Sequence, residues 1–231
     1  MFKSMKIAAI AACLTAFFAI AANAQTTGTV SMSATVSKFV EINSGGAVTL
    51  TGNLGGGVTT DGTVNTPLAV VINLGELGPS NASSFVTANV PLKLRSNAAY
   101  VLSTIATVTS TGSTANKITS ADVGFGLGTV TRAGVGVNTA GVDTNATAGD
   151  PTLVANGSVN ATSGRYEFTA VRSNLSAFAT STTALNGAFI MNAVPKTNTN
   201  GLTVPAIFAV KPQFYENGTT TASVTFTVTA P

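Results

Sequence analysis

Apolar and polar residues alternate along most of this chain with the period of two that is typical of β-strands. The last segment shows this most clearly, because Ser and Thr fill every second position from Ser223 to Thr229. The apolar positions between them, which share one face of the predicted final strand, are Val224, Phe226 and Val228. Beyond the N-terminal apolar run no segment keeps a period of 3.6 residues, so the chain is predicted to be all-β.

Turns rich in Gly, Asn and Ser divide the alternating segments into about eight to ten strands, and we expect an antiparallel, Ig-like β-sandwich. The predicted strands are Thr29–Ile42, Ala47–Thr51, Leu68–Leu74, Val86–Arg95, Tyr100–Thr109, Val123–Thr131, Arg165–Val171, Ala188–Val194, Leu202–Val210 and Thr220–Thr229. Leu175–Leu185 is interpreted as a loop or one short turn of helix. The 110–163 region, rich in Gly, Thr and Asn, is predicted to form loops or additional strands.

Local signals refine this prediction at two kinds of position. Ser96–Ala99 lies between two alternating segments and predicts a β-hairpin, and Asn217-Gly218 predicts another. Proline donates no ladder hydrogen bond, so the strands that contain it should lie at sheet edges or begin at the proline. The prolines concerned are Pro67, Pro91, Pro205 and Pro212.

The N-terminus has the three-part pattern of a secretory signal peptide. Two lysines precede the apolar run Ile7–Ile20, and Ala22-Asn23-Ala24 provides a small-x-small cleavage site. The run is too short to span a bilayer, so residues 1–24 are predicted to be removed and 25–231 to form one domain, with no membrane span after cleavage. Cys13 resembles a lipidated cysteine, but the residues after it are still apolar.

Removal of this segment changes the charge and the cysteine content. The only cysteine is lost, and the 11 Lys and Arg fall to nine, against eight Asp and Glu. A net charge near zero without a basic patch argues against nucleic acid as a partner. Charged residues make up 8% of the chain, compared with about 25% in an average soluble protein. Together with the predicted signal peptide, this composition favours a secreted or cell-surface protein.

The residues after the predicted cleavage site alternate in the same way as the final strand. Their apolar row consists of Val30, Met32, Ala34 and Val36. The stretch up to Ile42 is long for one strand, so we expect two strands that separate near Ser37-Lys38. The first is either a strand of its own sandwich or, as segment 25–37, a strand donated to a neighbouring subunit.

The chain resembles secreted Ig-like subunits of the archaic chaperone–usher pilins and spore coat U-type proteins. The resemblance rests on the alternating segment after the cleavage site, on "VPLKLRSNAAYVLS" (Val90–Ser103) and on the ending "FYENGTTTASVTFTVTAP". It implies that a periplasmic chaperone holds the final strand at Val224, Phe226 and Val228. The row from Val30 to Val36 would later replace the chaperone's strand, giving a homopolymer. The cysteine pair common in that family is missing here.

Residues that carry common enzyme chemistry are scarce. The chain has no histidine, which removes the commonest general base and a leading metal ligand. The eight carboxylates are scattered along the sequence. Asp143–Asp150 has oxygen ligands at alternate positions but lacks the glycine and glutamate of an EF-hand loop, and it is interpreted as a solvated turn. We therefore predict no enzyme, no catalytic residues, no metal site and no cofactor.

The sequence thus favours a structural or adhesive surface subunit, polymerised by strand exchange as in pili. A monomeric extracellular module that binds a glycan or a protein through the 110–163 loops is the second hypothesis. A small outer-membrane β-barrel is the third, although the chain does not consistently supply the aromatic girdles and the continuous strands of about ten residues that such barrels need.

Overall fold

The computed structural model describes residues 31–133, 142–143, 157–168, 174–190 and 201–231. The chain divides into two units, Met1–Ser37 and Lys38–Pro231. In the first unit the described residues, 31–37, have no regular secondary structure and are exposed. The predicted signal peptide lies outside the described residues.

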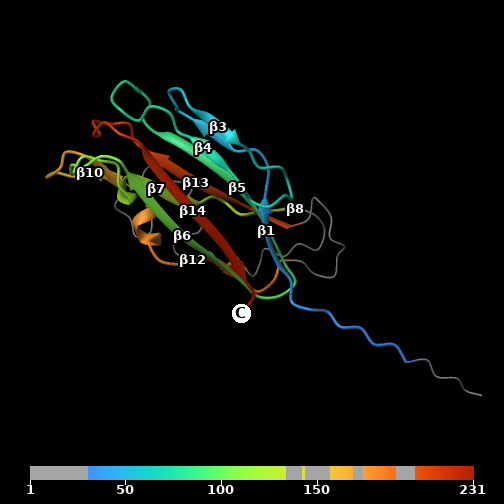
Figure 1. Ribbon diagram of the computed structural model, residues 1–231. Helices are drawn as coiled ribbons and strands as arrows, with labels where there is room; N and C mark the ends of the chain where they lie inside the picture. Colours follow the sequence, from blue (N-terminus) through green and yellow to red (C-terminus); the bar gives the residue numbers. More distant parts are fainter. Residues whose placement is uncertain (1–30, 134–141, 144–156, 169–173, 191–200) are drawn as a thin grey trace, which may run out of the picture. The chain divides into compact units, whose positions relative to one another are not determined.

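The second unit contains two large antiparallel sheets that pack face to face (Figure 1). The first sheet has six strands, β1 (Val40–Ser44), β2 (Thr49–Thr51), β5 (Val86–Ser96), β7 (Val123–Leu127), β8 (Thr131–Ala133) and β13 (Gly201–Val210). The second has four, β6 (Tyr100–Ser110), β9 (Val142–Asp143), β12 (Thr182–Gly187) and β14 (Thr220–Thr229). The predicted all-β sandwich is therefore confirmed.

The strand order places β5 and β13 at the centre of the first sheet and β14 at the edge of the second. The first sheet runs β1-β5-β13-β7, with β2 beside β5 and β8 beside β13, and the second runs β14-β6-β12-β9. Two small hairpin sheets complete the fold, one from β3 (Gly57–Thr60) and β4 (Val71–Asn73), the other from β10 (Gly157–Val159) and β11 (Tyr166–Phe168). Among the described residues, the only helical elements are the short 3-10 helices η1 (Ser120–Asp122) and η3 (Leu175–Phe178).

The core lies between the two large sheets and is built from their inward rows. On β5 and β13 the even-numbered residues face inward, as the period of two requires. Fully buried members of these rows include Leu92, Leu94, Leu202 and Val204. Phe125 on β7 lies at the centre of an aromatic cluster, with ring centroids 4.9 Å from Phe178, 5.2 Å from Phe208 and 6.1 Å from Phe226.

The prediction that prolines mark edge strands was wrong for Pro91 and Pro205. These two residues oppose each other in the middle of the central β5–β13 ladder. Their carbonyls point away from this ladder and accept hydrogen bonds of 2.7 Å from Gly45 and Gly128, respectively. In a strand the N–H and C=O of one residue point to the same side, so the missing N–H groups also face away from the shared ladder.

Each proline faces a break in the neighbouring strands. On the outer side of β5, β1 pairs with 92–96 and β2 with 87–89. Beyond β13, β7 pairs with 206–210 and β8 with 201–203. The chain crosses each break at a glycine, and a Cβ at Gly45 would lie 3.1 Å from the Cβ of Pro91. The sheet thus accommodates two central prolines by interrupting both of their neighbours.

The predicted hairpin at Ser96–Ala99 was also wrong. The strands on its two sides, β5 and β6, belong to different sheets, so the turn carries the chain across the core. The same is true of the residues that lead from β13 into β14. Alternating rows on two successive strands fit either arrangement, since apolar side chains meet both on one face of a hairpin and between facing sheets.

Two other segments differ from the prediction. Part of Leu175–Leu185, expected to be a loop, forms β12 from Thr182, although η3 is the short helical turn that was expected. Residues 188–190 of the predicted strand Ala188–Val194 are not in a strand, and 191–194 lie outside the described residues. The described part of 110–163 contains extra strands as well as loops, and β7 is buried at all five positions.

Replacing Phe125 with Ala should destabilise the sandwich strongly, because the ring is buried against Phe178 and Phe208. We expect the free energy of unfolding to fall by about 3–5 kcal/mol, measured by urea denaturation. Ile105→Ala is the matched control, since Ile105 lies on the outward side of β6 and is 41% exposed; its effect should stay within about 0.5 kcal/mol. Equal losses in both variants would show that this core assignment is wrong.

Candidate apolar groove beside the final strand

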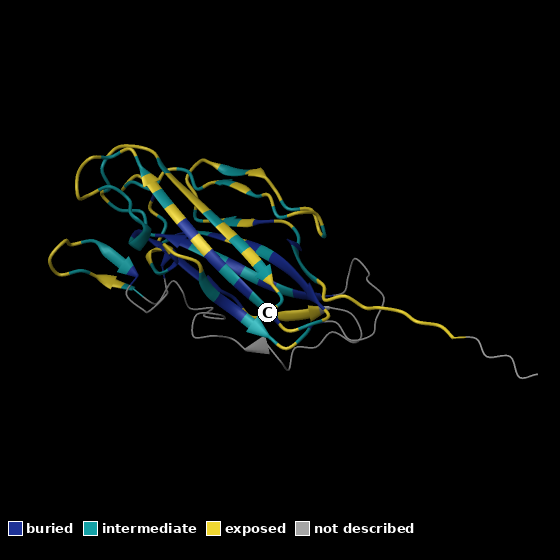
Figure 2. Ribbon diagram, turned by 60° about the horizontal axis from the view of Figure 1, so that its bottom comes forward, coloured by how far each residue is buried: buried dark blue, intermediate teal, exposed yellow. Residues whose placement is uncertain are grey.

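The final strand, β14, is an edge strand with one apolar face. It pairs with β6 over its whole length, from Thr220 opposite Ser110 to Thr229 opposite Val101. No other strand of the described residues pairs with it. Figure 2 shows exposed residues alternating with half-buried ones along β14. Apart from Thr220, the half-buried residues are those of the predicted row, and Val224, Phe226 and Val228 all pack against the core.

A groove of about 610 Å³ runs beside this edge. One wall is β14, which contributes Ala222, Val224 and Phe226. Ala88 and Val90 of β5 and Phe208 of β13 line it from the first sheet, and Ile42 of β1 does so at one end. The groove therefore gives access to the space between the two sheets along the edge where β14 has no neighbour.

The second wall is the segment Pro67–Leu74, which includes β4 and which we call the strap. Its residues alternate regularly in burial: the even-numbered ones are half-buried and the odd-numbered ones are exposed. The half-buried row, Leu68, Val70, Ile72 and Leu74, lines the groove and packs against the core. Both walls thus present apolar side chains at every second residue.

The chemistry of the groove favours an apolar, extended ligand. Within the described part of the chain no charged residue lines it, and its polar lining residues are Asn43 and Thr225. Apolar side chains entering it would be removed from water at a gain of about 25 cal/mol per Å². The unpartnered edge of β14 offers main-chain N–H and C=O groups to a strand placed beside it.

The residues of the predicted N-terminal row have a different environment. Val30 lies outside the described residues. Met32 is 92% and Val36 86% exposed, and Ala34 is exposed as well. The hypothesis that this row is a strand of its own sandwich does not hold for the described residues 31–36, since none of them is in a strand. The compact unit begins at Lys38.

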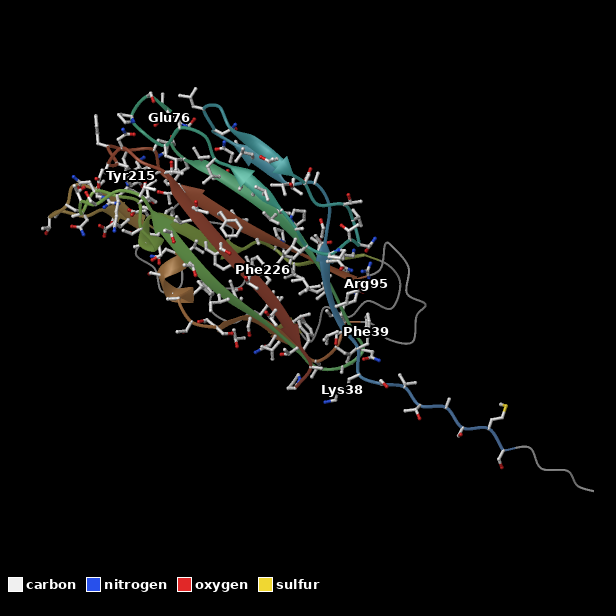
Figure 3. The ribbon with its side chains drawn as sticks, in the orientation of Figure 1. Lys38, Phe39, Glu76, Arg95, Tyr215 and Phe226 are labelled. Carbon is white, nitrogen blue, oxygen red and sulfur yellow. The ribbon has the colours of Figure 1, made fainter. Side chains whose placement is uncertain are left out.

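The start of the compact unit is attached near the end of β14. The Nζ of Lys38 donates a hydrogen bond of 2.5 Å to the main-chain oxygen of Pro231. Phe39 and Asn97 exchange two bonds, from Phe39 N to Asn97 Oδ1 at 2.7 Å and from Asn97 N to the Phe39 carbonyl at 3.1 Å. Figure 3 shows Lys38 and Phe39 below Arg95 and away from Glu76 and Tyr215, which lie near the opposite end of the sandwich.

The residues that lead into β14 are fixed by the carboxylate of Glu216. It accepts hydrogen bonds from the main-chain N–H groups of Ser113 and Thr114 at 3.0 and 2.7 Å, and from the hydroxyl of Thr114 at 2.6 Å. The Thr114 hydroxyl and these N–H groups stabilise the charged form and lower the pKa of Glu216 to about 2. The loop after β6 is thereby tied to the start of β14.

Other candidate sites gain no support from the described residues. No group of three or more His, Cys, Asp and Glu side chains in that part of the chain is placed to hold a metal ion. Of Asp143–Asp150, all but Asp143 lies outside it, as does much of 110–163. No helix within the described ranges is long and apolar enough to cross a membrane.

Comparison with known proteins found no matching family model and no similar curated protein. The resemblance to archaic chaperone–usher and spore coat U-type subunits therefore stays a prediction from sequence patterns.

Sequence reasoning found the β14 wall of the groove but missed the strap as its second wall. The alternation of Leu68, Val70, Ile72 and Leu74 predicted a strand there. Nothing in the sequence indicated that this strand would face β14 across a gap. The signal that was available is the matching period of the two segments, since both carry apolar residues at every second position.

A carboxylate on the inward row of β14 should prevent folding. Phe226→Asp places a charge beside Phe125 in the core, at a cost on the order of several kcal/mol. We expect no accumulation of folded protein, measured as soluble yield and melting temperature. Thr227→Asp is the control, since Thr227 is exposed on the other face of the same strand, and it should fold normally. Normal yield of Phe226→Asp would contradict the orientation of β14.

Acid should remove the contribution of Glu216. Its folded pKa of about 2 lies below the unfolded value of 4.5, so the stabilisation is complete above pH 4.5 and is lost as the pH falls to about 2. Glu216→Gln should therefore melt at a lower temperature than the wild type at pH 7, with a difference that shrinks from pH 4.5 downward, as followed by circular dichroism. A difference that is unchanged at pH 2 would show that the charge of Glu216 is not responsible.

Proposed function

We propose that this protein is a secreted, non-enzymatic surface subunit that polymerises by donating its N-terminal segment to the groove of the next copy. The donated residues are Val30, Met32, Ala34 and Val36, within segment 25–37. The acceptor is the groove between β14 and the strap. The predicted signal peptide supports export, and the cell surface is the proposed location.

The observation that carries this proposal is the one-sided pairing of β14. Its apolar row is only half-buried beside a groove of about 610 Å³, and the described residues supply no second strand partner. Open edges of this kind are sites where another chain adds a strand. An added strand would bond to the main chain of β14 and cover Val224 and Phe226 at the same time.

The N-terminal segment has the properties that this groove requires. Its apolar residues recur at every second position, which in an extended chain places them on one face about 6.6 Å apart. The lining residues of β14 and of the strap recur with the same period. Met32 and Val36 are exposed, so their burial in a neighbouring copy would add hydrophobic stabilisation. The serines and threonines between them suit the solvent-facing side.

A subunit with an open groove also needs protection before assembly. Exposed edge strands promote uncontrolled aggregation, and a charge near zero gives little repulsion between copies. We propose that a periplasmic chaperone covers β14 during export and that an usher carries out assembly. The support is the resemblance to chaperone–usher subunits together with the groove.

Deleting Gln25–Ser37 should abolish the polymer and leave the subunit folded, because the compact unit begins only at Lys38. The wild type should form multimers that resist SDS or heat, and the deletion variant should be secreted as a monomer, measured by light scattering and gel mobility. Met32→Asp is a milder variant that leaves the backbone intact and should weaken the multimers. A wild type that is purely monomeric would refute the proposal.

A further inference from the structure

The strap is held at both ends by main-chain hydrogen bonds. At one end, Ser44 of β1 donates to the carbonyl of Thr66 at 2.9 Å and accepts from the N–H of Asn65 at 3.0 Å. The guanidinium of Arg95 donates to the side-chain oxygen of Asn65. At the other end, Glu76 N donates to the Leu54 carbonyl at 2.9 Å, and Gln213 N donates to the Leu77 carbonyl at 3.0 Å.

Between these anchors the strap is attached to the sandwich mainly by side chains. Its strand, β4, pairs with β3 and with no other strand among the described residues. The even-numbered residues of the strap are half-buried toward the groove, whereas Val71 is 55% exposed on the other face. The half-buried residues are Leu68, Val70, Ile72 and Leu74. The strap therefore resembles a strand aligned with the sandwich but separated from β14 by the groove.

We propose that the strap is a recognition wall that contacts the incoming strand from the side opposite β14 and selects aliphatic side chains at alternate positions. This inference rests on the proposed function. The occupant is the Val30–Val36 segment of a second copy. Its backbone bonds to β14, and the aliphatic row of the strap, chiefly Ile72 and Leu74, covers its side chains from the other side.

Three features favour this arrangement over a strap that is displaced by the donor. The two sets of anchors lie outside the groove-lining residues, so they stay intact when the groove is filled. The groove is already present with the strap in place. The strap row is already oriented toward it, with the same period as the donor row.

The test uses the chain without Gln25–Ser37, because in the full chain the segment of a neighbouring copy would already occupy the groove, and a fluorescent synthetic peptide with the sequence of Gln25–Ser37. The compact unit begins at Lys38, so the shortened chain keeps the whole sandwich, and it serves as the wild type in the comparisons below. Peptide binding to wild type, Ile72→Ala, Leu74→Ala and the control Val71→Ala is measured by anisotropy, after their melting temperatures have been compared. We expect Ile72→Ala and Leu74→Ala each to weaken binding about tenfold, as expected for loss of buried aliphatic contacts. Val71→Ala should stay within about twofold of wild type, because its side chain is outside the groove.

Hydrogen exchange on the wild type gives a second measurement that does not depend on how the variants fold. The peptide should slow exchange in both β14 and the strap. Protection of β14 alone, or faster exchange in the strap, would overturn the inference and leave the proposed function standing. Binding that is equal in wild type and both groove-facing variants would overturn it as well. A shortened chain that does not bind the peptide, together with a full chain that forms no multimers, would refute the proposed function itself.

Discussion

The pair of prolines in the central ladder is the constraint from which much of the architecture follows. Pro91 and Pro205 oppose each other on β5 and β13, and neither can donate to a further strand on its outer side. The first sheet therefore has a break on each flank, between β1 and β2 and between β7 and β8. Gly45 and Gly128 approach the proline carbonyls at these breaks and satisfy the acceptors that would otherwise lack a partner.

The break beside β5 also determines where the groove can form. Because β1 ends at Ser44 and the chain rejoins β5 only at β2, the outer edge of the first sheet is interrupted, and the strap begins beside the end of β1. Ser44 itself provides the first anchor of the strap, so the end of one strand and the start of the second groove wall depend on one residue. The space between the strap and β14 has a volume of about 610 Å³ and carries no strand in the described structure.

The period of two was sufficient to predict the fold class, the inward row of β14 and most strand positions. It was not sufficient to assign strands to sheets. The rows of β5 and β6 have the same alternation whether they share one sheet or face each other, so the turn between them was misread as a hairpin. The prolines were misplaced for a related reason: the sequence shows that an N–H is missing, but only the tertiary structure shows whether a neighbouring strand is interrupted there. The strap was recognised as a strand, whereas its position across the groove depends on anchors at Ser44, Leu54 and Gln213 that are distant in sequence.

The pairing of β14 with β6 has a consequence for the order of events during folding. The partners of Val101 to Ser110 are Thr220 to Thr229, more than 100 residues later in the sequence, so this edge of the second sheet cannot close before the intervening residues have been made. Ladders between such distant segments form slowly, and during that interval the edge of β6 that faces β14 has no partner. The interval before closure, more than the finished fold, is then the stage at which the chain is most exposed to aggregation.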